Sequence, residues 1–244
     1  MSIVFTCSID DGYPSDMRVA ELLIKHDINA TFFIPIKNRS GLNMLSIQQI
    51  RNLGHHFEIG SHTYDHCYLT TINIIEAQRQ IYEGKNRLED ILGKKINGFC
   101  YPGGKYWQEH VDMVKSAGFA YARSVMNLRF DAGDDMFKVP TTMQFYPHDR
   151  IIYLRNFIKA GHWLKRSDGL RLALEHQHWI DRLYALFEYA YQHGDVFHLW
   201  AHSWEIDTLG IWSEFNRFLA YVAAKVAIEN RLDNGQLVSR FFRP

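Results

Sequence analysis

The stretch Ile-Val-Phe-Thr-Cys-Ser-Ile-Asp-Asp-Gly, residues 3–12, leads an apolar and β-branched run into two carboxylates and a glycine. The run predicts a strand over residues 3–8, and apolar residues at helical spacing predict a helix over residues 15–26. Strand-like and helical stretches continue to alternate along the chain. This alternation is typical of an α/β fold built from βα units.

The remaining expected elements follow from the same periodicities and from capping and turn residues. Further strands are expected over residues 30–34, 56–61, 98–101, 119–125, 139–144, 196–201 and 236–239. Further helices are expected over residues 46–53 (closed by Gly54), from Thr71 or Asn73 to Gly93, over 107–116, over 150–193 with a break near 167–169, and over 212–230. Residues 127–138 are expected to form a loop.

Length and composition exclude several classes of protein. The 244 residues, 47% of them hydrophobic and 22% charged, suit one domain over residues 1–244. Lys plus Arg and Asp plus Glu both number 27, so the chain lacks the basic field of a nucleic-acid-binding protein. No apolar run is long enough to span a membrane. Three widely spaced cysteines and a strand-like beginning without a signal-peptide pattern predict a cytoplasmic protein.

Polar residues capable of chemistry come where predicted strands end. Asp10 and Asp11 follow the first strand, His62 the third, Pro102 the fourth and His202 a late one. Active sites of α/β barrels gather at the carboxyl ends of their strands. The sequence therefore predicts that these residues lie together.

Histidine spacing distinguishes two candidate metal-binding pairs. His198 and His202 belong to a predicted strand, where four residues span about 13 Å, too far to share one ion. His62 and His66 lie between a strand and a helix, where one helical turn would bring their side chains to about 6 Å. They are either ligands of a divalent metal or ordinary surface histidines.

Asp10-Asp11-Gly12 is open to two interpretations. Asp-Gly is a frequent turn signal, so the block could be a solvated turn. Alternatively, one carboxylate completes a zinc site with the two histidines, and the other takes a proton from a water. In the second interpretation, Gly12 lets the backbone turn so that both carboxylates converge.

Two later blocks could complete a hydrolytic site. The loop Tyr101-Pro102-Gly103-Gly104 offers close substrate approach and backbone N–H groups for an oxyanion. His202 is either a structural histidine or an acid that protonates a leaving amine.

Taken together, in order and spacing, these blocks resemble the polysaccharide deacetylases, the NodB-type carbohydrate esterases, over residues 3 to about 206. The resemblance implies an irregular (β/α)7 barrel like that of glycoside hydrolases and deacetylases. It implies that Asp10 is the base and that Asp11, His62 and His66 hold one divalent metal ion, expected to be zinc. It also implies that His202 is the general acid.

The same resemblance places the substrate groove. It implies that Tyr101, Pro102, Gly103 and Gly104 line the groove, with an oxyanion donor on or near Gly103, and that Trp200 borders the acetate pocket in place of a leucine. Members of the family remove N-acetyl, less often O-acetyl, groups from sugars. Shorter relatives that lack a signal sequence and serve bacterial cell-surface polysaccharide synthesis are the most similar in pattern.

Two departures from the family pattern concern the catalytic groups. Cys100 stands where the family has an arginine that contacts the catalytic aspartate, and Arg18 or Arg123 could replace it. No Asp-x-x-Asp-Trp block is present to orient the histidine, and Glu205 or Asp207 could serve instead.

Aromatic residues gather near the motifs, and sugar faces stack on such rings, although rings at strand ends more often belong to the core. These aromatic residues are Tyr13, Tyr64, Tyr101, Tyr106, Trp107, Trp200 and Trp204. Tyr101 and Trp107 are the candidates for a sugar platform.

The sequence therefore predicts a metal-dependent deacetylase acting on an acetylated carbohydrate in glycan biosynthesis, with no nucleic-acid partner. Two rival hypotheses remain open. The first is an amidohydrolase acting on a small non-sugar amide or cyclic imide, favoured by a closed pocket where a roomy groove favours a sugar. The second is an inactive relative that only binds carbohydrate. The sequence does not indicate the oligomeric state, the sugar or its carrier.

Overall fold

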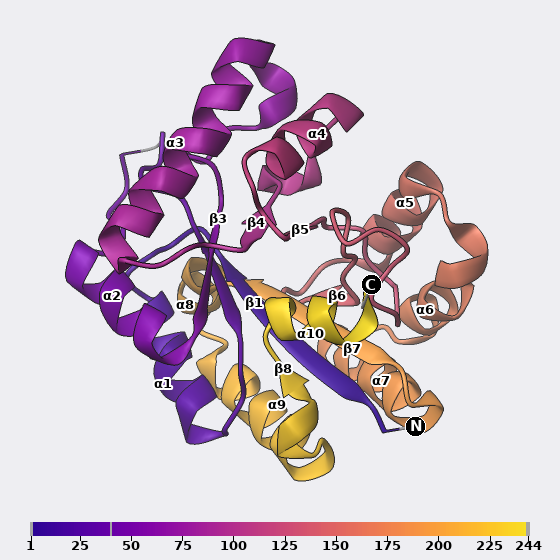
Figure 1. Ribbon diagram of the computed structural model, residues 1–244. Coiled ribbons are helices and arrows are strands. Elements are labelled where there is room, and N and C mark those ends of the chain that lie inside the picture. The colour runs from indigo at the N-terminus through magenta and orange to yellow at the C-terminus, as the bar shows by residue number, and fades with distance from the viewer. Residues whose placement is uncertain (1, 40, 243–244) are drawn as a thin grey trace.

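The computed structural model describes residues 2–39 and 41–242, and a curled sheet of parallel strands lies at its centre (Figure 1). The strands are β1 (Val4–Asp10), β2 (Thr31–Ile34), β3 (Glu58–Ser61), β4 (Gly98–Cys100), β5 (Tyr121–Arg123), β6 (Met143–Gln144), β7 (Val196–His202) and β8 (Arg231–Leu232). Their order in space is β5-β4-β3-β2-β1-β7-β6, with β8 also paired to β1.

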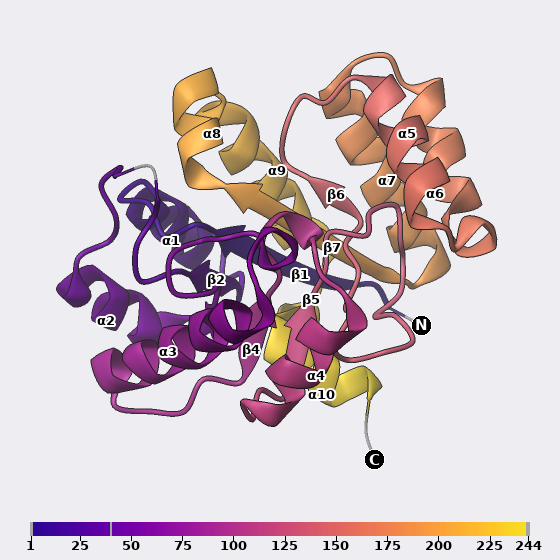
Figure 2. The same ribbon diagram turned by 90° about the horizontal axis from the view of Figure 1, so that it is seen from above.

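Helices surround this sheet (Figure 2). They are α1 (Asp16–Lys25), α2 (Ile47–His56), α3 (Ile74–Leu92), α4 (Gln108–Ser116), α5 (Arg150–Ala160), α6 (Trp163–Glu175), α7 (Trp179–His193), α8 (Ser203–Leu209), α9 (Trp212–Lys225) and α10 (Asn234–Phe241). Short 3-10 turns cover Leu69–Thr71, Pro102–Gly104 and Ile228–Asn230. No helix in residues 2–39 and 41–242 combines the length and apolar character needed to cross a bilayer.

The central strand β1 is buried along its whole length and sets the position of the candidate site. It pairs with β7 from Val4↔Val196 to Asp10↔His202. On its other edge, β8 occupies the first half and β2 the second. The β1–β7 register alone therefore brings Asp10 beside His202 at the carboxyl end of the sheet.

Alternation along β1 divides its side chains between two environments. Phe5, Cys7 and Ile9 belong to the large core beneath the helices. On the opposite, inner face, Thr6 contacts Asn234 of α10 and Ser8 hydrogen-bonds to His198 of β7. The inside of the curled sheet is therefore a polar, hydrogen-bonded column that ends at Asp10.

The segment 136–142 runs between β5, at one edge of the curled sheet, and β7, which lies next to the other edge. Val139 bridges to Arg123 of β5, and the Thr142 N–H donates to the His198 carbonyl of β7 at 2.9 Å. The prediction of an α/β fold with an irregular, barrel-like sheet is confirmed. The expected sixth strand over 139–144 is wrong in its extent, because only Met143 and Gln144 pair with β7 as a strand.

Two other expected elements are wrong for identifiable reasons. Residues 236–239 belong to helix α10, which a capping box between Asp233 and Gln236 initiates. The helical stretch over 150–193 breaks at Gly161 and again near residue 177, so Gly169 lies inside α6. A Cβ on Gly169 would meet the Leu128 Cβ at 2.8 Å, so this glycine allows close packing and does not end a helix.

Gly54, expected to close a helix, is a second glycine of this kind. It lies inside α2, which continues to His56, and a Cβ there would meet Leu92 of α3 at 2.6 Å. The helix expected over 212–230 ends at Lys225, and α8 directly after β7 was not expected. By contrast, α3 begins after Asn73, whose side chain accepts from the Glu76 N–H, and ends at Gly93 in a left-handed conformation, as predicted.

Candidate active site

Both aspartates of the first motif face the candidate site because the chain turns sharply after β1. Asp10 is the last residue of β1, not a residue beyond the strand as expected. Asp11 has a φ of 84° and Gly12 a φ of 68°. A non-glycine residue rarely adopts a positive φ, and such strain is typical of functional sites. This turn places the neighbouring carboxylates close together, where an extended strand would separate them.

The two histidines of the second motif come together in a loop. Their ring centroids lie 4.9 Å apart, but the predicted helical turn is wrong. Thr63 has a φ of 66° and His66 a φ of 57°, so the chain doubles back after β3.

Helix α3 holds this histidine loop from behind. The Gln80 side-chain oxygen accepts from the backbone N–H groups of Tyr64 and Asp65 at 3.1 and 3.0 Å. Gly84 lets the helix approach closely, because a Cβ there would lie 2.8 Å from the Thr63 carbonyl carbon. The metal-ligand candidates are therefore positioned by residues that the motif itself does not contain.

Asp11, His62 and His66 form a cluster suited to a divalent metal. The Asp11 Oδ1 atom lies 3.0 Å from His66 Nε2 and 3.6 Å from His62 Nε2. This oxygen is buried, and no group in the described residues forms an aligned hydrogen bond with it. A carboxylate and two imidazoles are a common zinc-ligand set with room for water. The residues present therefore fit the metal that the sequence predicts.

Protonation states around the cluster favour metal binding. His62 Nδ1 donates to the Cys100 carbonyl at 2.8 Å, which leaves Nε2 free to face Asp11. Burial lowers the pKa of His62 to about 4, so the ring is neutral at physiological pH. Burial alone would raise the pKa of Asp11, but the surrounding histidines hold it well below its usual range.

Asp10 pairs with a buried arginine. Arg123 contacts the Asp10 Oδ2 atom through its guanidinium, and its side chain is fully buried. Burial alone would lower the pKa of Arg123, but Asp10 raises it above its ordinary value. The other oxygen, Asp10 Oδ1, is buried and has no hydrogen-bond partner in the described part of the chain. It is therefore the oxygen available to take a proton.

The origin of this arginine resolves the departure at Cys100. Cys100 of β4 pairs in register with Arg123 of β5, so the two side chains share one face of neighbouring strands. The Cys100 Sγ lies 3.8 Å from the same Asp10 oxygen that Arg123 contacts. Arg18, the other candidate, is wrong for this place, because its guanidinium stacks on the Trp212 ring at 4.3 Å.

His202 has carboxylates at both ring nitrogens. Its Nδ1 lies 2.9 Å from Glu205 Oε2, and its Nε2 lies 3.6 Å from Asp11 Oδ2. Burial alone would lower the pKa of His202, but the Glu205 hydrogen bond and the nearby aspartates raise it to about 9. The ring is therefore protonated at neutral pH, as a general acid must be. The alternative partner Asp207 instead accepts from the Trp212 indole.

Two contributors to the site were not assigned a role from the sequence. Gln144 of β6 donates to Glu205 at 2.8 Å and lies 3.4 Å from His202 Nδ1. Trp204 donates its indole N–H to Asp11 Oδ2 at 3.2 Å. The nearness of Trp204 to the His202 motif could have suggested its role, whereas no local pattern marks Gln144.

The third motif borders the site, but its aromatic residue points away from it. Tyr101 is fully buried, stacks on Tyr106 at 4.1 Å between centroids and donates to the Phe137 carbonyl. Its ring therefore cannot be the sugar platform expected for it. Pro102–Gly104 form the 3-10 turn, and Gly103, with a φ of 59°, packs against the Tyr68 ring.

The other predicted aromatic positions are accessible to different degrees. Trp107 is 56% exposed and Trp204 is 38% exposed. Trp204 also stacks on His202 with centroids 5.9 Å apart, so it presents a ring at the site itself. Trp200 lies under the Arg123 guanidinium, 5.3 Å from its ring centroid.

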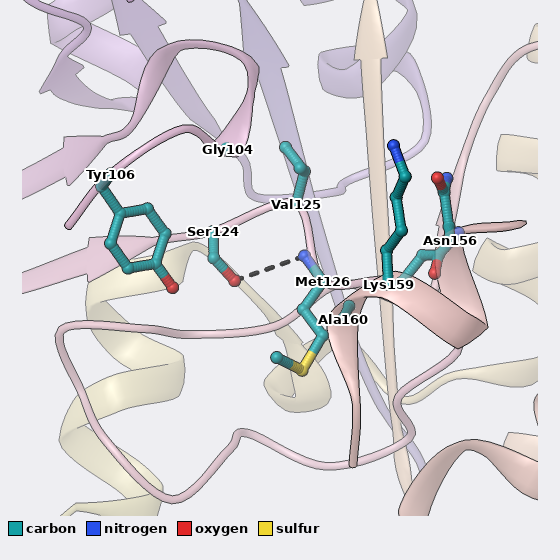
Figure 3. Close-up of a pocket in the computed structure, with 9 residues that line it drawn as sticks. Gly104, Tyr106, Ser124, Val125, Met126, Asn156, Lys159 and Ala160 are labelled. Atoms are coloured by element: carbon teal, nitrogen blue, oxygen red, sulfur yellow. Dashed lines mark hydrogen bonds between the residues drawn. The ribbon is translucent and has the colours of Figure 1, made fainter. Parts of the chain in front are cut away.

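A crevice between the third motif and α5 comes close to His202 through Gln144, which lines its inner part and lies 3.4 Å from the ring nitrogen. Its inner part is a cavity of about 70 Å³ bordered by Trp200, Gln144 and Asn156 among others. The outer part, of about 430 Å³, shares Asn156 and extends to Gly104 and Lys159. Figure 3 shows Tyr106 on one side of this outer part and Asn156 and Lys159 on the other. His202 and the candidate metal ligands do not line either part, so the crevice adjoins the site through Gln144 and Trp200, which lie against His202.

Comparisons with known proteins relate the chain to polysaccharide deacetylases. Residues 3–122 match the family model described as polysaccharide deacetylase. A curated relative from Arthroderma benhamiae, named as a probable peptidoglycan-N-acetylglucosamine deacetylase, is 26% identical over 145 residues. The match covers 58% of this chain but only 30% of the relative, so this chain spans less than a third of that protein.

Solved structures share the fold at low sequence identity. The CE4 domain of a multidomain xylanase from the hindgut metagenome of Trinervitermes trinervoides has a TM-score of 0.56 at 11% identity, covering 98% of this chain and 90% of that one. A CE4 family pseudoenzyme from Bacillus anthracis has a TM-score of 0.53 at 16% identity, covering 97% and 66%. A Streptococcus pyogenes deacetylase in complex with acetate has a TM-score of 0.51 at 18% identity, covering 55% and 62%.

Proposed function

Because this chain belongs to the polysaccharide deacetylase family, we propose that it is a metal-dependent hydrolase that removes N-acetyl groups from a sugar. The observation that carries the proposal is the convergence of the candidate ligands Asp11, His62 and His66 with two groups suited to proton transfer. Asp10 has a free buried oxygen, and His202 is held protonated.

These residues would have separate roles in amide hydrolysis. Asp11, His62 and His66 would hold a divalent metal ion such as zinc, whose positive charge would polarise the amide carbonyl and make a water more acidic. Asp10 takes a proton from the water that adds to the carbonyl carbon. His202 gives a proton to the nitrogen as the carbon–nitrogen bond breaks, which releases acetate and an amine.

Several neighbours would keep these groups in place. Glu205 accepts from the His202 ring and fixes which nitrogen faces the candidate metal site. Arg123 holds one oxygen of Asp10, so that the other stays directed away from the guanidinium. A backbone N–H on or near Gly103 would stabilise the oxyanion, in keeping with the resemblance of this block to the family motif.

The crevice supports a sugar over a small cyclic imide. Its outer part measures about 430 Å³, which suits a substrate extending well beyond one acetamide group. Amide side chains of Asn127 and Asn156 line both parts, and amides hydrogen-bond readily to sugar hydroxyls. The name of the curated relative supports an N-acetylglucosamine-containing substrate.

Metal analysis combined with acetate release tests the proposal. The purified chain should hold about one divalent metal per molecule and should release acetate from N-acetylglucosamine oligomers. His66→Ala should lose the metal and the activity, whereas Asp10→Asn should keep the metal and lose nearly all turnover. His55→Ala, a change at an exposed histidine of α2, is the matched control and should leave both unchanged.

Other outcomes would favour the rival hypotheses. Metal without hydrolysis of any acetylated sugar, but with hydrolysis of a small amide or cyclic imide, would favour the amidohydrolase. Metal binding with no hydrolysis at all would favour a carbohydrate-binding relative. A CE4 family pseudoenzyme with this fold has been solved. Full activity in Asp10→Asn would contradict the assigned base.

A further inference from the structure

Helices α5 and α6 leave a group of large apolar side chains uncovered. Ile151 is 66% exposed, Ile158 62%, Trp163 60% and Leu164 94%. Both views place the two helices together at one side of the molecule, next to β6 and α7 (Figures 1 and 2). Exposed apolar side chains gathered on two packed helices in this way usually mark an interaction surface.

The spacing on α5 makes one continuous face. Ile151, Leu154, Arg155, Ile158 and Lys159 follow each other at helical intervals of three and four residues. The same five residues line a shallow surface depression. Apolar side chains thus alternate with cations on the outer side of this helix, while Tyr153 anchors the inner side in the core.

The segment is also charged differently from the rest of the chain. Residues 150–166 contain five basic residues and no acidic one. Since the whole chain has 27 of each kind, the remainder has 22 basic and 27 acidic residues. Some of the five are already engaged: Arg166 donates to backbone carbonyls, and Lys165 pairs with Asp134 at 2.5 Å. Arg155 and Lys159 remain on the exposed apolar face.

We propose that this docking face, formed by Ile151, Leu154, Arg155, Ile158, Lys159, Trp163 and Leu164, binds the surface of an anionic phospholipid bilayer. Aliphatic side chains with interspersed cations are the composition of helices that lie in the membrane interface. The apolar side chains enter the boundary between headgroups and acyl chains, and Arg155 and Lys159 contact lipid phosphates. Trp163 supplies the indole that is common at this depth.

The docking face adjoins the crevice that lies beside the candidate site. Lys159 lines both the surface depression and the outer crevice, and Asn156 and Ala160 of the same helix line the crevice (Figure 3). Docking through α5 therefore places the mouth of the crevice at the lipid headgroups. It follows, resting on the proposed function, that the acetylated sugar is presented on a lipid carrier.

Co-sedimentation of the full chain with vesicles tests the docking without any substrate. Vesicles of phosphatidylcholine containing phosphatidylglycerol should retain the protein, vesicles of phosphatidylcholine alone should retain much less, and added salt should weaken the binding. Ile151→Ser/Ile158→Ser/Leu164→Ser should lose most of the bound fraction. Arg155→Glu should weaken binding at least about fivefold, the contribution of one charge near an anionic surface.

A matched variant separates the docking face from general surface hydrophobicity. Leu42→Ser/Ile75→Ser/Ile228→Ser changes three apolar side chains that are 56%, 78% and 61% exposed on other parts of the molecule. It should bind vesicles like the unchanged chain. An equal loss of binding in this control would overturn the proposal.

Two further outcomes would also overturn it. One is no binding to anionic vesicles at low salt. The other is a concentration-dependent dimer that the α5–α6 variant abolishes, since the face would then join two copies of this chain. Acetate release from a soluble acetylated sugar is measured separately, so failure of the docking and failure of the proposed function are distinguishable.

Discussion

Replacing Arg123 by methionine tests the central electrostatic feature of the candidate site. The Asp10 side chain is 3% exposed and that of Arg123 is fully buried, so water could not solvate either charge if its partner were removed. Removing one member of a buried ion pair typically destabilises a protein by about 3–5 kcal/mol, because the other charge is left uncompensated. Methionine keeps apolar bulk against the Phe33 and Trp200 rings that the guanidinium contacts.

A double-mutant cycle isolates the charge contribution. In the Asp10→Asn background the buried Arg123 guanidinium has itself lost its partner, so Arg123→Met removes an uncompensated charge there and should cost at most about 1 kcal/mol, the size of the lost cation–π contacts. The expected coupling free energy is therefore at least about 2–4 kcal/mol. It is measured by urea unfolding of the four proteins in the presence of a chelator, with circular dichroism as the readout.

Arg166→Met is the matched control for this cycle. Arg166 is another fully buried arginine, but it donates to the carbonyls of Asn127, Phe157 and Gly161 and has no carboxylate partner within residues 2–39 and 41–242. Its loss should destabilise the fold equally in both Asp10 backgrounds. If Arg123→Met also cost the same in both, with a coupling below about 0.5 kcal/mol, the pairing of Arg123 with Asp10 would be refuted.

Three further predictions concern other parts of the molecule. Burial raises the pKa of Glu58 from 4.5 to about 7, so the folded protein holds a proton on Glu58 that the unfolded chain has lost. The free energy of unfolding should therefore fall by about 3 kcal/mol as the pH rises from 4.5 through 7. Urea unfolding at a series of pH values measures this fall, which should be much smaller in Glu58→Gln. Gly84→Ala should force α3 away from Thr63, cost about 1–3 kcal/mol and weaken zinc affinity, measured by competition with a chelating dye. Glu205→Gln should move the alkaline limb of the pH–rate profile to lower pH, because His202 loses the hydrogen bond that helps raise its pKa to about 9; an unmoved limb would contradict His202 as the acid.

The sequence predicted what local patterns encode. The apolar run over β1 predicts that strand directly. The Asn73 cap and the terminal Gly93 predict where α3 begins and ends, because each acts on backbone groups within a few residues of itself. The metal-ligand candidates were found because Asp11, His62 and His66 sit in short motifs at strand ends. Convergence of these motifs then followed from parallel pairing, since carboxyl ends of parallel strands meet at one edge.

What could not be predicted depends on packing between distant segments. Gly54 and Gly169 read as helix ends, because nothing local shows that another element approaches at those positions. The 62–66 loop read as a helical turn, because its two positive φ angles are imposed by contacts with α3. The role of Gln144 needs the β6–β7 pairing, which joins residues more than fifty positions apart.

The arginine that contacts Asp10 depends both on a local sequence motif and on the pairing of two strands, and this can be tested. The motif shows that Cys100 replaces a family arginine, but only the β4–β5 register shows that Arg123 occupies the neighbouring place on the same face. A guanidinium from either strand should therefore reach the same carboxylate. Arg123→Cys alone should destabilise the chain by about 3–5 kcal/mol. Adding Cys100→Arg should recover a large part of that loss in urea unfolding. If the second change deepened the loss instead, the two strands would not be interchangeable sources of this charge, and the register explanation would be wrong.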